Sequence, residues 1–456
     1  MNPTDHFFGG GGQTDLSPVT MAIAAVAALL IAVLPRRYVL VPLIVSCILL
    51  PLEQQVVVAG IHLPVARLLI LVGLLRLCML GDAGRTVWTQ VDKLFFAFCV
   101  SNVITYVILW GEVGALINRL GFFFNAMGMY LLVRKLIATR EDLDRLTKTL
   151  VWVFAAIALS MAFELATGRN LISILGGVPA ASVIREGKIR AQGPFSHPLT
   201  GGAIGASLLC LAYGLWWQDK KNKVTAATGV LAALVISVAA SSSTSSLTFA
   251  AGLVALAAWR WRSQLHSFWW GLTGVLIILH ICMKAPVWAL IARIDLTGSS
   301  SGYHRYILVD QFIRRFGEWW LFGTLTTANW GSDAWDTINS YVAAGTSGGL
   351  INFVLFVAVL VVACRRLKDK RVASSHDPAL ARRCWVLSAL IFTHSVAFFG
   401  IAYFDQSQFV WYAELAMVSS VLMLQPAVQA KSARSRVHYY PPDAPFLLEN
   451  ERHSLV

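Results

Sequence analysis

The sequence predicts an all-α integral membrane protein of about twelve or thirteen transmembrane helices, and three observations lead to this fold class. Hydrophobic residues make up 57% of the 456 residues and charged residues only 13%, whereas soluble domains carry about 25% charged residues. Apolar segments recur at lengths of roughly 17 to 23 residues, which is enough to cross a hydrocarbon core. Basic residues follow every second segment. Most of the chain therefore has lipid as its solvent.

The apolar segments can be placed in order along the chain. The second is short and interrupted by Pro42 and Pro51, and the eighth and ninth come from one apolar run that is divided at 241–246. The segments are expected near 19–34, 38–52, 62–80, 93–110, 115–137, 149–167, 198–217, 224–240, 244–259, 265–283, 346–364, 384–403 and 408–425.

Basic residues set the predicted orientation, because Lys and Arg collect in cytoplasmic loops. Each odd-numbered segment is followed by such residues: Arg36, Arg37; Arg76, Arg85; Arg134, Lys135, Arg140; Lys220, Lys221, Lys223; Arg260, Arg262; Arg365, Arg366, Lys368, Lys370, Arg371; and Lys431, Arg434, Arg436. The N-terminus and the even-numbered exits are then predicted to face outward. The formal charge of +13 reflects this topology and the contact with membrane lipids rather than a nucleic-acid partner.

The chain divides into three regions. Residues 1–18 contain no Lys or Arg and no cleavage site, so we expect a short flexible tail outside the membrane rather than a signal peptide. Residues 19–430 form the membrane domain, with two long outward loops at about 168–197 and 284–345. Residues 431–456 hold three prolines among polar residues and are expected to be a disordered cytoplasmic tail. The seven cysteines show no CxxC spacing, so neither disulfides nor a zinc site is expected.

The first long loop carries a basic motif at 185–198, REGKIRAQGPFSHP. Arg185, Lys188 and Arg190 stand beside a predicted membrane face, where a guanidinium fork fits the paired oxygens of a phosphate. A cationic cluster there can stabilise the charge that grows on a diphosphate leaving group. The alternative is that the three side chains only extend to lipid head groups.

The same motif ends in a predicted tight turn at Gly193-Pro194-Phe195, after which the chain re-enters the membrane at His197-Pro198. His197 is a secondary candidate for a catalytic base. A histidine that caps the start of a helix is the commoner case.

The second long loop contains a predicted helix at 305–320, where apolar residues recur at helical spacing and two tryptophans stand at the end. It is expected either to lie along the membrane interface or to pack on the protein as an ordinary amphipathic helix. Arg305 at its start is a candidate for a second phosphate contact. The neighbouring His304 is a secondary candidate and is more simply a solvated loop residue.

Polar residues stand just before the eleventh apolar segment. If a helix begins near Asp336, then Asp336, Asn339 and Ser340 share one face, and the carboxylate could deprotonate an acceptor hydroxyl. The alternative is an aspartate that caps the helix, with a hydrogen-bonded asparagine. Asp333 adds another carboxylate, but the outward aspartates form no DxD pair, so no metal and no other cofactor is expected.

The pattern Arg190-x-x-Gly193-Pro194-Phe195-x-His197-Pro198, followed by a helix and by a large loop that ends in Asn339-x-Tyr341 and glycines, resembles the O-antigen ligase and O-antigen polymerase superfamily. The resemblance implies a glycosyltransferase of the bacterial inner membrane that acts on the periplasmic face without a metal. It implies an undecaprenyl-diphosphate-linked glycan as donor and a growing glycan or lipid A core as acceptor, in O-antigen or exopolysaccharide assembly. Arg190 matches the family arginine that contacts the donor diphosphate.

Two family residues are missing from this sequence. The stretch 241–247, SSSTSSL, lacks the second family arginine, and Ile338 stands where the family has a histidine before Asn339. We hypothesise that Arg305 and Asp336 take over these roles, which would place the chain in a divergent branch.

These observations predict inverting glycosyl transfer in which Arg190, with Arg185, Lys188 and Arg305, neutralises the diphosphate. Asp336 would activate the acceptor and Asn339 would orient it. The main alternative is a flippase or other transporter of lipid-linked oligosaccharide, which should concentrate polar groups at mid-membrane. Arg67 and Glu164 are the charged residues within apolar segments that such a reading would use. A non-catalytic scaffold would need no outward cluster of charged groups.

Overall fold

The computed structural model describes residues 14–58, 61–80, 87–293, 301–331 and 334–426. Residues 1–13 of the predicted tail at 1–18, the predicted tail at 431–456, the basic residue Arg85 and the candidate Asp333 lie outside the described residues. Within the rest of the predicted N-terminal tail, the amide of Asp15 donates to the carbonyl of Gln55 at 3.1 Å, and α1 begins at Pro18.

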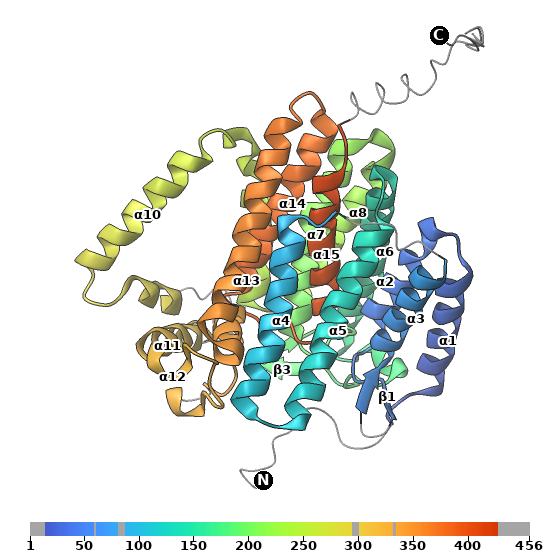
Figure 1. Ribbon diagram of the computed structural model, residues 1–456, viewed down its shortest axis with the longest axis horizontal. Helices are drawn as coiled ribbons and strands as arrows, with labels where there is room; N and C mark the ends of the chain where they lie inside the picture. The colour runs from blue at the N-terminus through green and yellow to red at the C-terminus, as the bar shows by residue number, and fades with distance from the viewer. Residues whose placement is uncertain (1–13, 59–60, 81–86, 294–300, 332–333, 427–456) are drawn as a thin grey trace, which may run out of the picture.

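The described residues form 15 α-helices and four short strands, so the predicted all-α fold class is confirmed (Figure 1). A helix lies at each predicted apolar segment: α1 (Pro18–Val33), α2 (Leu40–Leu49), α3 (Val65–Met79), α4 (Gln90–Trp110), α5 (Val113–Leu136), α6 (Arg140–Thr167), α7 (Pro198–Gln218), α8 (Lys223–Ala239), α9 (Ser243–Ala257), α10 (Leu265–Cys282), α13 (Ser340–Ala373), α14 (Pro378–Ala397) and α15 (Ser407–Met423). The short helical turns are η1 (Arg36–Tyr38), η2 (Leu171–Leu175), η3 (Lys220–Asn222), η4 (Ala258–Trp261), η5 (Val287–Arg293) and η6 (Ala328–Trp330). Two antiparallel hairpins complete the fold, β1 (Gln55–Val58) with β2 (Ile61–Pro64), and β3 (Val183–Arg185) with β4 (Lys188–Arg190).

The connections that the sequence marks as basic meet at one end of the helix bundle, which we call the basic end. Arg36 after α1 donates to the carbonyl of Lys135 at the end of α5 at 2.7 Å. Arg382 at the start of α14 donates to the carbonyl of Trp217 at the end of α7 at 3.0 Å. Segments that are far apart in the sequence are therefore joined there.

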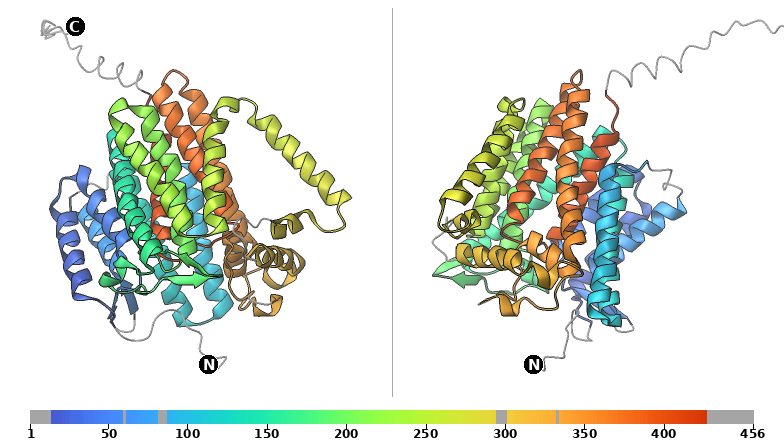
Figure 2. Two further views of the ribbon diagram at one scale, coloured as in Figure 1. Left: turned by 180° about the vertical axis from the view of Figure 1, so that it is seen from behind. Right: turned by 60° about the vertical axis from the view of Figure 1, so that its left-hand side comes forward.

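The remaining connections meet at the opposite end, which also holds both strand hairpins and is called the hairpin end (Figures 1 and 2). Ser17 before α1 donates its hydroxyl to the carbonyl of Leu175 after α6 at 2.8 Å. Asn339 before α13 donates its amide to the carbonyl of Phe399 after α14 at 3.2 Å. Both long predicted loops start and finish at this end.

Seven of the described helices are long and apolar enough to cross a membrane: α4, α5, α6, α7, α8 together with η3, α10 and α13. Helix α2 has ten residues and is therefore about 15 Å long, roughly half the thickness of a hydrocarbon core. The structure thus supports a membrane protein.

Helix α7 is the most enclosed of these seven helices, since 83% of its apolar window is buried inside the protein. Its glycines let α8 approach closely, because a Cβ at Gly205 would overlap the side chain of Ile236. Small residues at helix contacts are typical of membrane proteins, where close packing rather than water exclusion holds helices together. The start of α7, which carries the GPFSHP motif, is therefore held by a rigid core.

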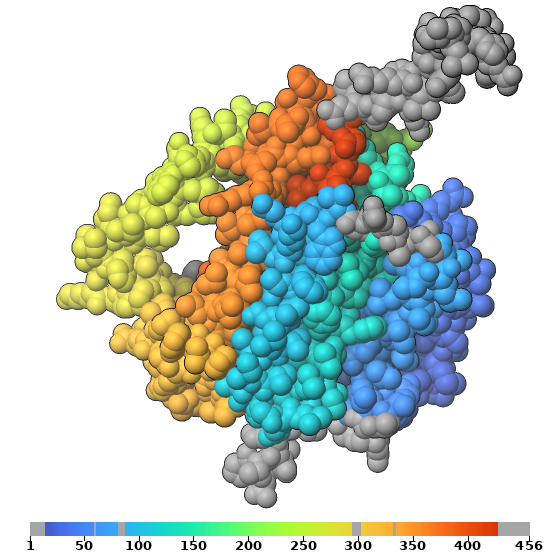
Figure 3. Space-filling model, in the orientation of Figure 1, coloured from blue at the N-terminus to red at the C-terminus, as the bar shows by residue number. Residues whose placement is uncertain are grey.

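Helix α10 departs from the bundle. None of its residues is buried, and Figure 3 shows an opening between α10 and α13. Near the far end of α10 the chain continues through η5 into α11 (Ser301–Arg314) and α12 (Phe316–Trp319), which lie across the hairpin end (Figures 1 and 2). The helix predicted at 305–320 is confirmed, although Arg315 separates it into two pieces.

Candidate functional site

The three basic residues of the first long loop lie on one face of the hairpin β3–β4. Arg185 pairs directly with Lys188, and Arg190 pairs with Val183. Residues opposite each other, and residues two apart on one strand, share a face of a β-ribbon. The turn at Glu186-Gly187 has φ values of 51° and 73°, the positive pair that a tight type I′ hairpin requires. The hairpin therefore presents Arg185, Lys188 and Arg190 together.

Strand β4 is fixed to the connection between α8 and α9. The amide of Ala191 donates to the carbonyl of Ala239 at 3.0 Å. Ser241 donates its hydroxyl to the β4 carbonyl just before Arg190 at 3.1 Å. Arg190 Nε reaches the carbonyl of Ala240 at 3.4 Å, and its side chain is buried, with the residue only 6% exposed. The guanidinium is thus held against the α8–α9 connection, whereas Arg185 and Lys188 are exposed.

Arg305 reaches the same connection from the second long loop. It lies in the first turns of α11, is 8% exposed, and donates from Nη2 to Thr244 Oγ1 at 2.8 Å. Thr244 belongs to the stretch 241–247 that has no arginine of its own. Two arginines from loops more than a hundred residues apart in the sequence therefore converge on one turn between two helices.

The pKa values of Arg190 and His197 are lowered, as expected where positive charges converge in a buried site. Burial lowers the pKa of Arg190 from its ordinary value, and the charges of Arg185 and Arg305 lower it further. Burial also lowers the pKa of His197 to about 4, with Arg190 and Arg185 adding to the effect. His197 is therefore neutral near pH 7, while arginine stays charged. We call Arg185, Lys188, Arg190 and Arg305 the cation cluster.

His197 is the N-cap of α7, which confirms the capping alternative. Its ring accepts a hydrogen bond from the amide of Leu199 at Nδ1, with a distance of 3.1 Å. In the neutral ring the accepting nitrogen carries the lone pair that a base would use, and this bond occupies that lone pair. The proline that follows is at the first helical position, where its missing N–H costs nothing.

The turn between β4 and α7 is held from below by Glu164, near the end of α6. Its carboxylate accepts from the amide of Gly193 at 2.9 Å and from the amide of Gln192 at 3.2 Å. It also accepts from the hydroxyl of Ser182, just before β3, at 3.1 Å. Gly193 has φ of 59°, a left-handed conformation that glycine adopts without strain. A buried carboxylate thus fixes both ends of the hairpin that carries the cation cluster.

The same turn is held from the other side by the loop before α15. Asp405 is fully buried and accepts from the amide of Ser196 at 3.0 Å and from the hydroxyl of Thr200 at 2.7 Å. Burial raises the pKa of Asp405 from its ordinary value. Gln406 donates to the carbonyl of Pro194 at 2.7 Å. The motif at 191–198 is therefore a rigid support rather than a free loop.

The predicted arrangement at 336–340 is wrong in one respect. Helix α13 begins at Ser340 and not near Asp336, and its N-cap is Asn339, whose side chain accepts from the amides of Tyr341 and Val342. The Asn339 amide group also donates to Phe399, so both ends of this side chain bond to the protein. Asn339 therefore does not orient an acceptor. Asp336 lies before the helix in a turn, and its side chain is exposed.

Helix α11 packs on the protein by one face and exposes apolar residues on another. Leu308 and Phe312 are buried in a small cluster with Trp319, Trp330, Ala334 and Val342. Ile313 is 45% exposed and Trp320 is 47% exposed. His304 is half-buried beside Arg305. The packing alternative for this helix is confirmed, and its exposed apolar side chains are available to a lipid surface.

Arg67 and Glu164, the two charged residues within apolar segments that a transporter would use, are both hydrogen-bonded locally. Arg67 donates to the side chain of Asn125 at 3.0 Å and to the carbonyl of His62 at 2.7 Å. Glu164 supports the hairpin as described above. These two charges therefore have structural partners.

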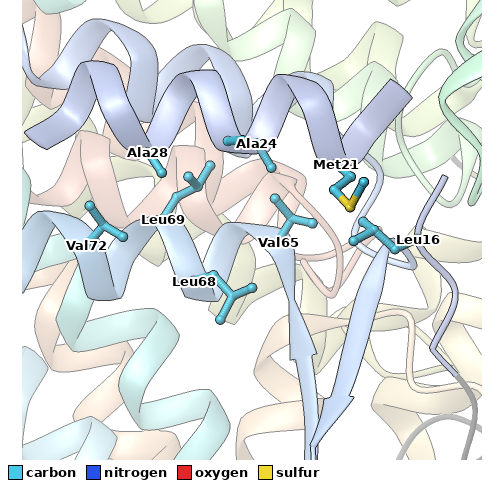
Figure 4. A pocket seen from close by; sticks show the side chains of 9 residues that line it. Leu16, Met21, Ala24, Ala28, Val65, Leu68, Leu69 and Val72 are labelled. Atoms are coloured by element: carbon cyan, nitrogen blue, oxygen red, sulfur yellow. The ribbon is translucent and has the colours of Figure 1, made fainter. Parts of the chain in front are cut away.

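A separate apolar groove of about 250 Å³ lies between α1 and α3 (Figure 4). Its lining is aliphatic, apart from the thioether of Met21: Leu16, Met21, Ala24, Ala25, Ala28, Val65, Leu68, Leu69 and Val72. Such a surface holds no group for acid–base or anion chemistry. Within the described part of the chain, no group of three or more His, Cys, Asp or Glu side chains could hold a metal ion.

The structure brings together Arg185, Arg190, Arg305 and His197, which the sequence placed in two separate loops. It also shows three acidic residues near the motif that sequence reasoning did not assign to it: Glu164, Asp405 and Glu53, whose carboxylate accepts from the Ser196 hydroxyl at 2.5 Å. A carboxylate inside an apolar segment was a signal for Glu164, whereas nothing local marks the other two. Comparison of the chain with family models, with curated proteins and with solved structures finds no match.

Proposed function

We propose that the protein is a membrane glycosyltransferase that transfers a glycan from an undecaprenyl-diphosphate donor to a hydroxyl acceptor at the hairpin end. The observation that carries this proposal is the convergence of Arg190 and Arg305 on the α8–α9 connection. Arg190 donates there to a neutral carbonyl and Arg305 to a neutral hydroxyl. Placing like charges close together in a partly desolvated site is costly, and a bound polyanion would relieve this cost.

A diphosphate fits the cluster better than a single anionic group. Arg190 and Arg305 come from opposite sides of one turn, while Arg185 and Lys188 extend from the hairpin face beside them. Two phosphates spread charge over several oxygens, which suits paired guanidinium forks. In the transition state the leaving diphosphate gains negative charge, and fixed cations stabilise that charge more than they stabilise the ground state.

The exposed apolar side chains of α11 and α12 support a lipid-linked donor. They lie on the same helical segment as Arg305, so a polyprenyl chain in the bilayer and its diphosphate at the cluster would be bound by one element. In this proposal about thirteen helices cross or enter the bilayer, the basic end faces the cytoplasm and the hairpin end faces the periplasm. The protein would then belong to the bacterial inner membrane and to the O-antigen ligase and polymerase superfamily.

In the proposed reaction the acceptor oxygen attacks the anomeric carbon while the bond to the diphosphate oxygen breaks, which inverts the configuration in one step. Asp336 is an exposed carboxylate of the second loop, close in sequence to the start of α13, and is the first candidate to remove the acceptor proton. The cation cluster would supply the charge stabilisation by itself, so no metal takes part. The acceptor would be a growing glycan or lipid A core.

The test is a transfer assay with the purified protein in lipid nanodiscs and an undecaprenyl-diphosphate oligosaccharide as donor, with products resolved by size. Longer glycans with released undecaprenyl diphosphate would support a polymerase, and a single transfer that needs added lipid A core would support a ligase. Arg190→Ala is expected to reduce transfer by about 10²- to 10³-fold, as for the loss of one transition-state donor. Arg169→Ala is the matched control, because Arg169 is an exposed arginine of the same loop.

Absence of product under both conditions, together with movement of the intact donor between leaflets, would replace this proposal with the flippase alternative. Equal transfer by the wild-type protein and by Arg190→Ala would show that the cation cluster takes no part in the reaction.

A further inference from the structure

Three titratable side chains form a hydrogen-bonded chain beneath the hairpin end. Glu414 on α15 bonds through Oε2 to Nε2 of His394 on α14 at 2.7 Å. The other ring nitrogen of His394, Nδ1, bonds to the hydroxyl of Tyr403 at 2.9 Å. The His394 side chain is 0% exposed and that of Glu414 is 2% exposed, whereas Tyr403 is half-buried in the loop between α14 and α15. The chain therefore runs from the interior toward the surface.

The roles of the donors and acceptors follow from the chemistry of the partners. In the tautomer that carries its proton on Nε2, the ring of His394 donates to the Glu414 carboxylate. Nδ1 then carries a lone pair and accepts from the Tyr403 hydroxyl. Burial raises the pKa of Tyr403 well above its ordinary value, and the charges of Glu414 and Asp405 add to this effect. Tyr403 is thus a neutral phenol whose proton points at an imidazole base.

A hydroxyl, an imidazole and a carboxylate in this order are the arrangement that proteins use to activate a hydroxyl group. The carboxylate orients the ring and stabilises the imidazolium that forms when the ring takes a proton. A purely structural network would also satisfy these groups, so the position of the array relative to the cation cluster is decisive.

The loop that carries Tyr403 contacts the cation cluster on one side. A Cβ at Gly400 would lie 2.6 Å from Thr244 Oγ1 and 3.3 Å from Arg305 Nε. Gly400 therefore lies directly against the side chain of Arg305 and its hydrogen-bond partner. Tyr403 follows three residues later.

On its other side the same loop contacts the motif at 191–198, because Asp405 accepts from Ser196 and Thr200. Tyr403 itself packs with Ala203 of α7 and Ile401. Tyr403 thus lies on the loop that contacts Arg305 through Gly400 and packs beside the start of α7.

We propose that Tyr403, His394 and Glu414 are the proton relay that deprotonates the acceptor hydroxyl; this inference rests on the proposed glycosyl transfer. As the acceptor oxygen bonds to the anomeric carbon, its proton passes to the Tyr403 oxygen and the Tyr403 proton passes to His394 Nδ1. The electron pair of the broken glycosidic bond leaves with the diphosphate, which the cation cluster stabilises. The imidazolium is paired with the Glu414 carboxylate until its proton returns to water through Tyr403. In this account Tyr403 is the catalytic residue, and His394 and Glu414 position and accept its proton.

In this inference Tyr403, and not Asp336, takes the proton of the acceptor hydroxyl. Substitutions at the two residues distinguish these alternatives. Tyr403→Phe keeps the ring and its packing and removes only the oxygen. Glu414→Gln keeps the volume and removes the charge. Tyr412→Phe is the matched control, because Tyr412 is also a buried phenol, on the same helix as Glu414, and its hydroxyl bonds to Gln408 at 3.4 Å. The other titratable groups that face the array are Asp405 from the loop and Cys210 from α7.

The measurements are glycan transfer from undecaprenyl-diphosphate oligosaccharide in nanodiscs between pH 5 and 9, and equilibrium binding of undecaprenyl diphosphate to the same samples. Tyr403→Phe is expected to lower turnover by about 10²-fold or more, the usual contribution of a general base, with diphosphate binding within about twofold of wild type. Glu414→Gln is expected to lower the maximal rate, because the imidazolium that forms during the reaction loses the carboxylate that stabilises it. Tyr412→Phe should leave turnover within a few fold of wild type, and Asp336→Asn is measured beside it as the rival base.

Unchanged turnover in Tyr403→Phe, or a loss that Asp336→Asn shows in its place, would overturn the relay. Parallel loss of diphosphate binding and of folded protein in Tyr403→Phe would assign the array to structure alone and would also overturn it. Absence of transfer by the wild-type protein would overturn the proposed function and this inference with it. Transfer that requires Arg190 but not Tyr403 would overturn this inference only.

Discussion

Arg383 at the basic end and Arg190 at the hairpin end are both buried, but their hydrogen-bond partners differ. At the basic end Arg383 forms an ion pair with Asp144 at 2.8 Å, and Arg140 forms one with Asp377. Around the hairpin β3–β4, Arg190 instead donates to a carbonyl, and Arg305 donates to a hydroxyl.

The two buried carboxylates near the hairpin β3–β4 likewise bond to neutral groups. Glu164 accepts from two backbone amides and a hydroxyl, and Asp405 accepts from amides and hydroxyls. Glu164 and Asp405 therefore support the backbone, whereas Asp144 and Asp377 at the basic end neutralise arginines. Exposed ion pairs also occur at the hairpin end, such as Arg185 with Glu186 at 4.0 Å. The contrast between the buried residues indicates that Arg383 stabilises the bundle, whereas Arg190 is placed to present positive charge to a ligand.

The largest expected effect comes from removing both buried arginines of the cluster. Arg190→Ala with Arg305→Ala should abolish measurable transfer, because each contact is worth about 10²- to 10³-fold in rate. The thermal midpoint of unfolding should stay within a few degrees of wild type, since the bonds to Ala240 and Thr244 join neutral acceptors and each contributes about 1 kcal/mol. Transfer assays and thermal unfolding of the same nanodisc samples check this. A large drop in the midpoint would show that the cluster is structural, as at the basic end.

Arg383→Ala should give the opposite result. Removing one partner of a largely buried ion pair leaves a carboxylate with less compensation and costs about 3 kcal/mol of stability. Transfer per folded molecule should be unchanged. Unfolding by heat or denaturant, with activity normalised to folded protein, measures both quantities. A specific loss of transfer without loss of stability would contradict the contrast between the two ends.

Thr244→Val tests whether the α8–α9 connection positions Arg305. The substitution keeps the shape and removes the hydroxyl that accepts from Arg305, which should cost about 1 to 2 kcal/mol, a reduction of roughly fivefold to thirtyfold in transfer. Thr248→Val is the control, because the hydroxyl of Thr248 bonds only within α9, to the carbonyl of Thr244 at 2.7 Å. Equal transfer rates in the two variants would show that the α8–α9 connection does not position Arg305.

The last prediction concerns His197 and affects stability rather than transfer. Its pKa is lowered to about 4 in the folded protein, below an unfolded value of about 6.5. The unfolded chain therefore binds more protons between these values, and stability should fall as pH drops from about 6.5 to about 4. His197→Asn keeps an N-cap and should remove this slope, which is at most about 1.4 kcal/mol per pH unit. Denaturant unfolding at several pH values measures it, and an unchanged slope would show that His197 is not held beside the cluster.

Much of the fold could be predicted from the sequence, because the membrane imposes simple rules on composition. Apolar segments of spanning length became helices at every predicted position, and the alternation of Arg and Lys predicted which connections would meet. The hairpin β1–β2 was not predicted, since its strands are short and lie beside a helix. The departure of α10 from the bundle depends on contacts and has no local signal.

The candidate site was predicted in part. Arg190 and Arg305 could be proposed from their loops, because basic residues beside an apolar segment are conspicuous. Their convergence on Thr244 and Ala240 depends on packing between distant segments. Asn339 was assigned to the acceptor because its role as an N-cap depends on where α13 begins, and the start could not be located within a few residues. The array of Tyr403, His394 and Glu414 joins a loop to two helices, and none of the three stands in a recognisable motif.

The central claim is that the cation cluster binds a lipid-linked diphosphate, and equilibrium binding in nanodiscs tests it most directly. The affinities of undecaprenyl diphosphate and undecaprenyl monophosphate would be compared for the wild-type protein, Arg190→Ala and Arg169→Ala. We expect the diphosphate to bind the wild type at least tenfold more tightly than the monophosphate, a difference of about 1.4 kcal/mol. Arg190→Ala should lose this preference and Arg169→Ala should keep it. Equal affinity for both lipids, or a preference that survives Arg190→Ala, would contradict the account.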